Sequence, residues 1–180
     1  DQFFPNSFIV NMMNTKADPR RATYFTPFPY TSSPASYKGA TPGEPQSFAY
    51  SRLHTFLRGA MLRPPVPNSN GSIPSSGNNA PLYDGIGPIR MLTFAEHNFI
   101  RAEAALRLGV TGDAESFFRA GITASMQDAG VAAADIATYL AANGTLTGDN
   151  TNKLKQIIEE KYVANYGVAL EPYNDWRRTG

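Results

Sequence analysis

The feature that most constrains this chain is the uneven distribution of proline. Thirteen of the fourteen prolines lie at or before Pro88, and only Pro172 lies after it. Alanine is distributed in the opposite way, with seven residues before position 91 and sixteen after it. Proline interrupts helices, whereas alanine has the highest helix propensity. The sequence therefore predicts a loop-rich region over residues 1–90 and a helical region over residues 91–180.

The composition is that of a folded protein with little net charge. Hydrophobic residues make up 42% and charged residues 17% of the 180 positions, so we expect a buried core and not a disordered chain. Sixteen basic and fifteen acidic residues give a net charge of +1, which argues against nucleic acid or an anionic membrane surface as a partner. The sequence has no cysteine, which removes disulfides, thiolate metal sites and thiol nucleophiles. No apolar run reaches the ~20 residues that a membrane-spanning helix requires.

The alanine-rich half carries start and stop signals for four helices. Residues 93–96 (TFAE) fit a capping box, and the helix that they begin is expected to end near Gly109. Asp113 is expected to cap the second helix, which Gly130 ends. The third helix is expected over about residues 133–142 and the fourth over about residues 151–166.

The first two of these helices are expected to form a hairpin similar to a tetratricopeptide repeat, about thirty-four residues long. Small residues let two helix backbones approach closely, while an aromatic ring fills the gap between them. The predicted fold class is therefore mainly α, with tetratricopeptide-like helical hairpins and a long irregular region rich in proline and aromatic residues. The positions that carry the hairpin pattern are Ala102, Gly109, Ala114, Phe118 and Gly121.

The first ninety residues allow fewer assignments. Residues 8–13 fit either a short strand or one helical turn, and residues 51–61 fit either a short strand or a helix. Prolines alternate with tyrosine and phenylalanine over residues 24–50. Residues 64–88 are typical of a loop, and loops of this length inside a compact domain often carry function.

The sequence contains no catalytic, phosphate-binding or dinucleotide-binding motif. Glu103 and Arg107 have the i,i+4 spacing of an ion pair on a solvated helix face, so no catalytic carboxylate is expected. His54 and His97 have no partners at the spacing of a zinc site. Residues 147–151 favour a helix-capping turn over a calcium site, because the spaced acidic ligands of an EF-hand are missing. No enzymatic activity, cofactor or metal ion is therefore expected.

Aromatic side chains on loops are the strongest indication of function. Tyrosine rings stack on the apolar faces of sugars, and their hydroxyls add hydrogen bonds. Tyr30, Tyr37 and Tyr83 are the candidate ligand-binding residues, because each lies among small, polar or turn residues. Other rings of the loop region are expected to be structural cover. Trp176, the only tryptophan, is expected to be a packed anchor.

Several segments resemble one known family in their order along the chain. They span most of its length, and their specificity comes from occurring together. The resemblance is to the SusD/RagB-like nutrient-binding lipoproteins of the Bacteroidetes outer membrane. The segments are DPRRATYF at residues 18–25, FAE at 94–96, RAEAALR at 101–107, AGITASM at 120–126, EKYVANYG at 160–167 and EPYNDWRRTG at 171–180.

The resemblance implies a helical fold of tetratricopeptide-like hairpins whose loops bind a glycan or another nutrient, without enzymatic activity. It also implies a partner, a TonB-dependent SusC-like transporter, and a cell-surface location through a lipidated N-terminal cysteine that this sequence does not contain. We therefore expect both regions to be parts of one larger SusD-like domain, of which this chain is the C-terminal part.

Two alternatives remain open from the sequence. A helical-repeat scaffold would bind a protein partner on a long apolar groove and would have an unremarkable aromatic loop. A glycoside hydrolase would need two carboxylates about 5–10 Å apart in a cleft.

Overall fold

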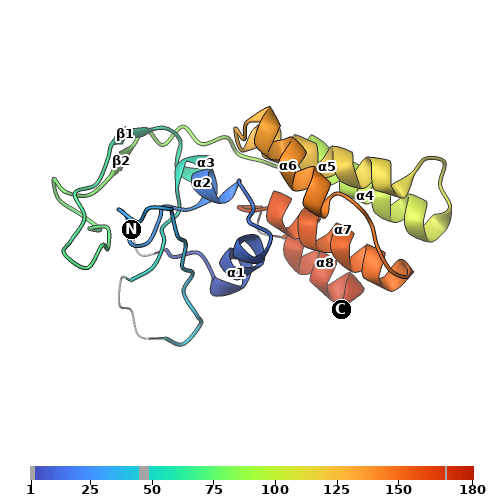
Figure 1. Cartoon of the computed structure of the whole chain (residues 1–180), viewed down its shortest axis with the longest axis horizontal. Coiled ribbons are helices and arrows are strands. Elements are labelled where there is room, and N and C mark those ends of the chain that lie inside the picture. Colours follow the sequence, from blue (N-terminus) through green and yellow to red (C-terminus); the bar gives the residue numbers. More distant parts are fainter. Residues whose placement is uncertain (1–2, 45–48, 169) are drawn as a thin grey trace. The chain divides into compact units, whose positions relative to one another are not determined.

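The computed structural model describes residues 3–44, 49–168 and 170–180, so residues 45–48 of the proline- and aromatic-rich segment lie outside the described residues. The chain divides into two compact units, Asp1–Pro88 (unit 1) and Ile89–Gly180 (unit 2), which are described separately (Figure 1). Eight helices and two short strands are found in the described ranges, which confirms the predicted mainly α fold.

Unit 1 is built from short elements joined by loops. Residues 8–13, which fitted either a strand or a helical turn, belong to a nine-residue helix that Asn6 caps by accepting a 2.8 Å bond from the Phe8 amide. The two strands are antiparallel, with Met61 opposite Tyr83 and Arg63 opposite Leu82. The elements are α1 (Ser7–Thr15), α2 (Arg21–Tyr24), α3 (Thr55–Arg58), β1 (Met61–Arg63) and β2 (Leu82–Tyr83).

A buried ion pair and a group of rings hold unit 1 together. The Arg20 guanidinium donates from Nε to Asp18 Oδ1 over 3.0 Å, and neither side chain reaches solvent. Asp18 Oδ1 also accepts from the Arg20 amide, so one carboxylate closes the turn and neutralises the buried cation. Tyr24 and Phe56 pack beside it with ring centroids 4.3 Å apart.

The described part of unit 2 contains five helices where four were predicted. The first four lie close to their predicted ranges, because the expected caps are present: Asp113 accepts from the Ser116 amide and Asp149 from the Asn152 amide. None of the described helices has both the length and the apolar character of a membrane span. The helices are α4 (Phe94–Leu108), α5 (Ala114–Asp128), α6 (Ala133–Asn143), α7 (Asn150–Ala164) and α8 (Glu171–Thr179).

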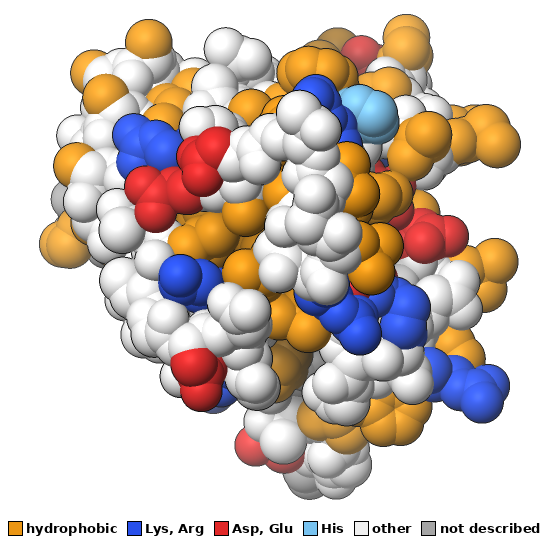
Figure 2. Space-filling model, turned by 90° about the vertical axis from the view of Figure 1, so that its right-hand side faces the viewer, with side chains coloured by type: hydrophobic (Ala, Val, Ile, Leu, Met, Phe, Trp, Pro, Cys, Tyr) orange, Lys and Arg blue, Asp and Glu red, His pale blue; other side chains and the backbone are white. Residues whose placement is uncertain are grey.

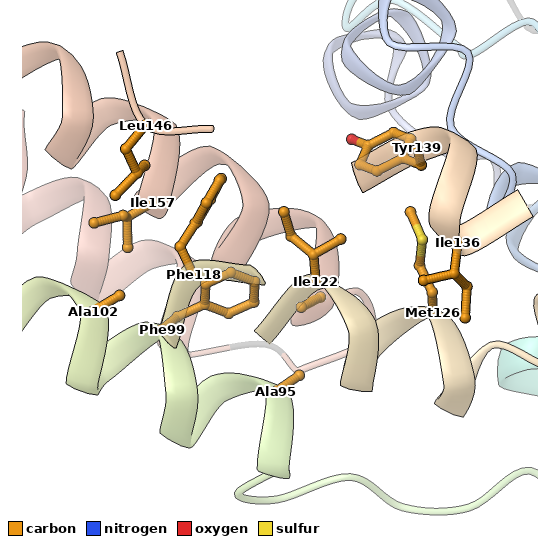
Figure 3. Packing of buried hydrophobic residues seen from close by; sticks show 11 residues of the cluster. Ala95, Phe99, Ala102, Phe118, Ile122, Met126, Ile136, Tyr139, Leu146 and Ile157 are labelled. Carbon is orange, nitrogen blue, oxygen red and sulfur yellow. The ribbon is translucent and has the colours of Figure 1, made fainter. Parts of the chain in front are cut away.

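The α4–α5 hairpin forms the centre of the unit 2 core. Figure 3 shows Phe99 of α4 and Phe118 of α5 side by side, and their rings meet edge to face with centroids 6.2 Å apart. Gly121 lies directly over the Phe99 ring: a Cβ atom at this position would come within 2.8 Å of a ring carbon. The small residue is therefore required by the close approach of the two helices, as the hairpin pattern predicted.

Replacing Gly121 with alanine is expected to destabilise the protein although alanine is the better helix former. The added methyl group collides with the buried Phe99 ring, which costs about 1–3 kcal/mol, against a gain of about 1 kcal/mol in helix propensity. Urea unfolding of Gly121→Ala measures the net change. Phe99→Leu removes the obstructing ring edge, so the double variant should be more stable than the sum of the two single effects. Simple additivity would contradict the proposed clash.

Candidate functional site

The structure brings two of the three candidate tyrosines close enough to interact electrostatically. Tyr30 and Tyr83 are both half-buried, and the Tyr30 phenol is one of the groups that act on the ionisation of Tyr83. Tyr37 has a different set of neighbours. Its ring lies 6.4 Å from the Phe25 ring, and the Arg21 guanidinium lies 5.3 Å from its centroid. Tyr30 and Tyr83 thus define a candidate site, whereas Tyr37 packs against the α2 region.

Tyr83 is held by a histidine and an arginine that the sequence did not single out as ligand-binding residues. A hydrogen bond of 2.7 Å joins the Tyr83 hydroxyl to His54 Nδ1, and the His54 ring meets the Tyr83 ring edge to face. The Arg58 guanidinium lies 4.0 Å from the Tyr83 ring centroid, which is a close cation–π contact. These two contacts fix the orientation of the ring.

The electrostatics of this cluster keep both titratable side chains neutral at ordinary pH. Burial, together with the positive charge of Arg58, lowers the pKa of His54 to about 4. Burial raises the pKa of Tyr83 to about 12, against the opposing effect of Arg58. A neutral imidazole and a neutral phenol are hydrogen-bonding groups suited to an uncharged hydroxylated ligand.

Short local elements place the cluster. His54 precedes α3 and Arg58 is its last residue, so both come from one helical turn. Gly59 then turns the chain with φ of +79°. A Cβ atom built on Gly59 would lie 2.0 Å from Asp84 Oδ1, so Asp84 occupies the space that a side chain would need. The Asp84 amide donates to the Ala60 carbonyl over 3.0 Å, which seats β2 beside the end of α3. The strand thereby delivers Tyr83 to His54.

Unit 1 also contains a polar hollow of about 390 Å³, and residues of the 68–76 loop form much of its lining. The Tyr30 amide donates to the Gly71 carbonyl over 2.9 Å, and Gly71 lies in the loop that forms one wall. The hollow carries amide and hydroxyl groups and one guanidinium on its walls. Its lining residues are Arg52, Asn68, Asn70, Ser72, Ile73, Pro74, Ser75 and Ser76.

Unit 2 has a second candidate, a groove of about 530 Å³ between α4, α7 and α8. Charged residues of the family-like segments meet beside it. Lys161 Nζ lies 3.4 Å from Glu96 Oε1 and 2.9 Å from Asp175 Oδ2, and all three side chains are buried. Asn165 donates to Glu96 over 3.2 Å. The charges of Lys161, Glu96 and Asp175 therefore compensate one another across three helices, and we assign this group a structural role.

Two sequence predictions need correction here. Thr93 caps α4 by accepting from the Glu96 amide, but the Glu96 carboxylate points to Lys161 and Asn165 and does not complete a capping box. Glu103 pairs with Arg107 as predicted, over 2.9 Å, yet it is not part of a solvated face: its side chain is 14% exposed and also accepts from Arg178 of α8.

The prediction of Trp176 as a packed anchor is wrong for this chain. Trp176 is 64% exposed and contacts Tyr173, whose ring centroid is 6.0 Å away. The reason is that α8 turns its neighbour Asp175 inward to Lys161, which leaves the indole outside.

On the face drawn in Figure 2, hydrophobic side chains reach the surface between acidic and basic ones, so no single charge dominates it.

Comparison with known proteins gives one family and a consistent fold. The sequence model of the SusD-like family, described as starch-binding and associating with the outer membrane, matches residues 1–180. A comparison with curated proteins gives no match.

Three solved structures show the same fold over nearly the whole chain. A SusD homolog from Bacteroides fragilis has 22% identity and a TM-score of 0.65, and the match covers 97% of this chain and 39% of that one. A SusD-like protein from Bacteroides thetaiotaomicron has 25% identity and a TM-score of 0.62, with 96% of this chain and 37% of that one covered. A chitin-binding SusD homolog from Flavobacterium johnsoniae has 24% identity and a TM-score of 0.66, with 96% and 36% covered in the same order. The chain thus spans less than two fifths of the length of these structures.

Replacing Lys161 with alanine is expected to destabilise the protein by about 3–5 kcal/mol, because Glu96 and Asp175 would remain buried without their shared cation. Lys155→Ala is the matched control on the same helix. Lys155 is 73% exposed and lies 3.9 Å from Glu159, so its loss should change stability by no more than about 0.5 kcal/mol. Denaturant unfolding of both variants checks this, and equal effects would refute the structural role of Lys161.

The lowered pKa of His54 predicts an acid-sensitive stability. The unfolded chain takes up a proton on His54 below about pH 6.5, whereas the folded chain does so only below about pH 4. Acidification through that interval therefore favours unfolding by about 1–3 kcal/mol, and the stability is recovered as the pH rises. His54→Gln should lose less stability between pH 7 and pH 4.5 than the parent protein. His97→Gln, which removes an exposed histidine, serves as the control and should keep the parental loss.

Proposed function

The chain belongs to the SusD-like family, and we propose on that premise that it contributes to the non-catalytic binding of an oligosaccharide or another nutrient at the outer-membrane surface. The resemblance seen in the sequence motifs is confirmed by the family match over residues 1–180. Starch binding describes the family, and chitin binding describes one of the similar structures. Both ligands are polysaccharides, which supports a glycan as the ligand class here.

The observation that carries the proposal is the pairing of half-buried tyrosines with neutral polar groups in unit 1. Tyr83 is oriented by His54 and Arg58, and Tyr30 lies within electrostatic reach of it. An oriented ring offers a flat apolar face for a sugar ring at little entropic cost, since the side chain is already fixed. Tyr37 remains a candidate on the sequence argument, although its packing on Phe25 and Arg21 separates its surroundings from those of Tyr83.

The chemistry of the hollow supports binding without turnover. Glycoside hydrolysis requires two carboxylates on either side of the scissile bond. The residues that line the polar hollow of unit 1 are amides, hydroxyls, an arginine and apolar residues. These groups hold hydroxylated ligands through hydrogen bonds and offer no acid–base pair for cleavage.

Delivery of the ligand is the further part of the proposal. The family resemblance implies a TonB-dependent, SusC-like transporter as partner and a lipid anchor that holds the intact protein at the cell surface. Co-purification of the intact protein with an outer-membrane transporter tests this part independently of ligand binding.

Removing the ring of Tyr83 or Tyr30 is expected to weaken oligosaccharide binding about fivefold each, because a stacked ring contributes about 1 kcal/mol. Titration calorimetry with neutral starch- and chitin-derived oligosaccharides measures the affinities of Tyr83→Ala and Tyr30→Ala. Phe8→Ala, which removes an exposed ring from α1, should bind as the parent does. Unchanged affinity in both tyrosine variants would remove this pair from the site. Failure of the parent to bind any saccharide would remove the glycan proposal and favour the protein-binding scaffold.

A further inference from the structure

The outer face of α8 carries two exposed aromatic rings that lie outside the candidate site of unit 1. Tyr173 is 53% exposed and Trp176 is 64% exposed, and the two residues lie three positions apart on the helix. Residues at this spacing share one face of a helix. Their ring centroids are 6.0 Å apart, and the ring planes are tilted by 37°. The two rings therefore form one continuous aromatic surface that reaches solvent.

Charged side chains on the other side of α8 hold the helix in place. Asp175 is buried and pairs with Lys161 of α7 over 2.9 Å. Arg178 pairs with the same carboxylate over 2.8 Å and also with Glu103 of α4. At roughly 100° per residue, Asp175 and Arg178 lie on the side of the helix away from the two rings. The rings are thus carried on a fixed support, which lowers the entropic cost of binding a ligand.

The size and polarity of this surface fit a sugar better than a protein partner. A stable protein interface buries about 800 Å² on each partner, whereas two aromatic side chains supply less than about 500 Å². The exposed Arg177 lies on the same face, and its guanidinium is 6.0 Å from the Tyr173 ring centroid. A sugar uses both features, because its apolar face stacks on a ring and its hydroxyls accept hydrogen bonds from a guanidinium.

We propose that Tyr173 and Trp176 form a second glycan-binding surface, in addition to the candidate site of unit 1, on which a neutral oligosaccharide stacks. This inference rests on the proposed glycan-binding function and adds a binding site in unit 2. The tilt between the ring planes suits two successive sugar residues that are rotated relative to each other, with one residue on each ring. Arg177 donates hydrogen bonds to the hydroxyls of the stacked residues.

The experiment uses the fluorescence of Trp176, which is the only tryptophan of the chain and reports directly on this surface. The 180-residue chain is titrated with maltoheptaose and with N-acetylchitohexaose while the emission of the indole and its quenching by acrylamide are followed. Because the indole is exposed, acrylamide should quench it readily before any saccharide is added. At least one of the two saccharides should then shift the emission to shorter wavelength and protect the indole from acrylamide.

Two variants of α8 distinguish ring stacking from general apolar contact. Tyr173→Leu keeps an apolar side chain but removes the ring, so the midpoint of the fluorescence titration should move to about fivefold higher saccharide concentration. Leu170→Ala is the matched control, because it removes an exposed apolar side chain without a ring at the start of the same helix. It should keep the parental midpoint.

The outcomes separate this inference from the function on which it rests. An indole that is shielded from acrylamide before saccharide is added overturns the inference, because the surface is then already covered. A saccharide that binds by calorimetry without changing the emission or quenching also overturns it, and leaves the proposed site of unit 1 standing. Equal midpoints for Tyr173→Leu and Leu170→Ala overturn the role of the paired rings. Failure of the parent to bind either saccharide by calorimetry overturns both proposals.

Discussion

One buried lysine determines how the helices of unit 2 are held. Lys161 of α7 lies between Glu96 of α4 and Asp175 of α8, and so joins three helices that are widely separated in the sequence. A buried ion pair contributes little net stability compared with apolar packing, but its removal leaves charges without compensation. The network therefore specifies which helix faces meet, while the Phe99–Phe118 contact supplies the apolar burial. Conformational specificity and stability come from different residues of the same unit.

Unit 1 reaches an ordered state by other means, because its proline content prevents long helices. The Asp18–Arg20 pair closes one turn in the interior, and Tyr24 and Phe56 pack around it. Aromatic rings bury large areas per residue, which lets short elements share a core. The rings that are left half-buried at the edge, Tyr30 and Tyr83, are then rigid without being inaccessible. Under the proposed function, these half-buried rings are the candidates for stacking on a ligand.

The sequence predicted the helices of unit 2 well because their ends are chemically marked. Asp113 and Asp149 cap as expected, and Gly121 has the predicted close approach. The last helix, α8, was missed because Pro172 and a run of charged residues hide its pattern. Trp176 was misplaced because the ion pair of its neighbour Asp175 with Lys161 sets the rotation of that helix. Tyr83 was proposed from local composition and stays a prediction. Its partner His54 lies 29 residues away, and the long-range pairing of β1 with β2 and the Asp84–Ala60 bond bring the two together, which no local pattern records.

Gly59 allows α3 and the backbone after β2 to approach closely, in addition to turning the chain. The volume that any larger residue would need is filled by the Asp84 carboxylate, and the backbone that follows β2 bonds directly to the end of α3, where the Gly85 amide donates to the Arg58 carbonyl. The hydrogen bond between His54 and Tyr83 therefore depends on the absence of a side chain at a third position. Even the smallest substitution at Gly59, which adds one methyl group, would push Asp84 and β2 away from α3 and so disturb the candidate site.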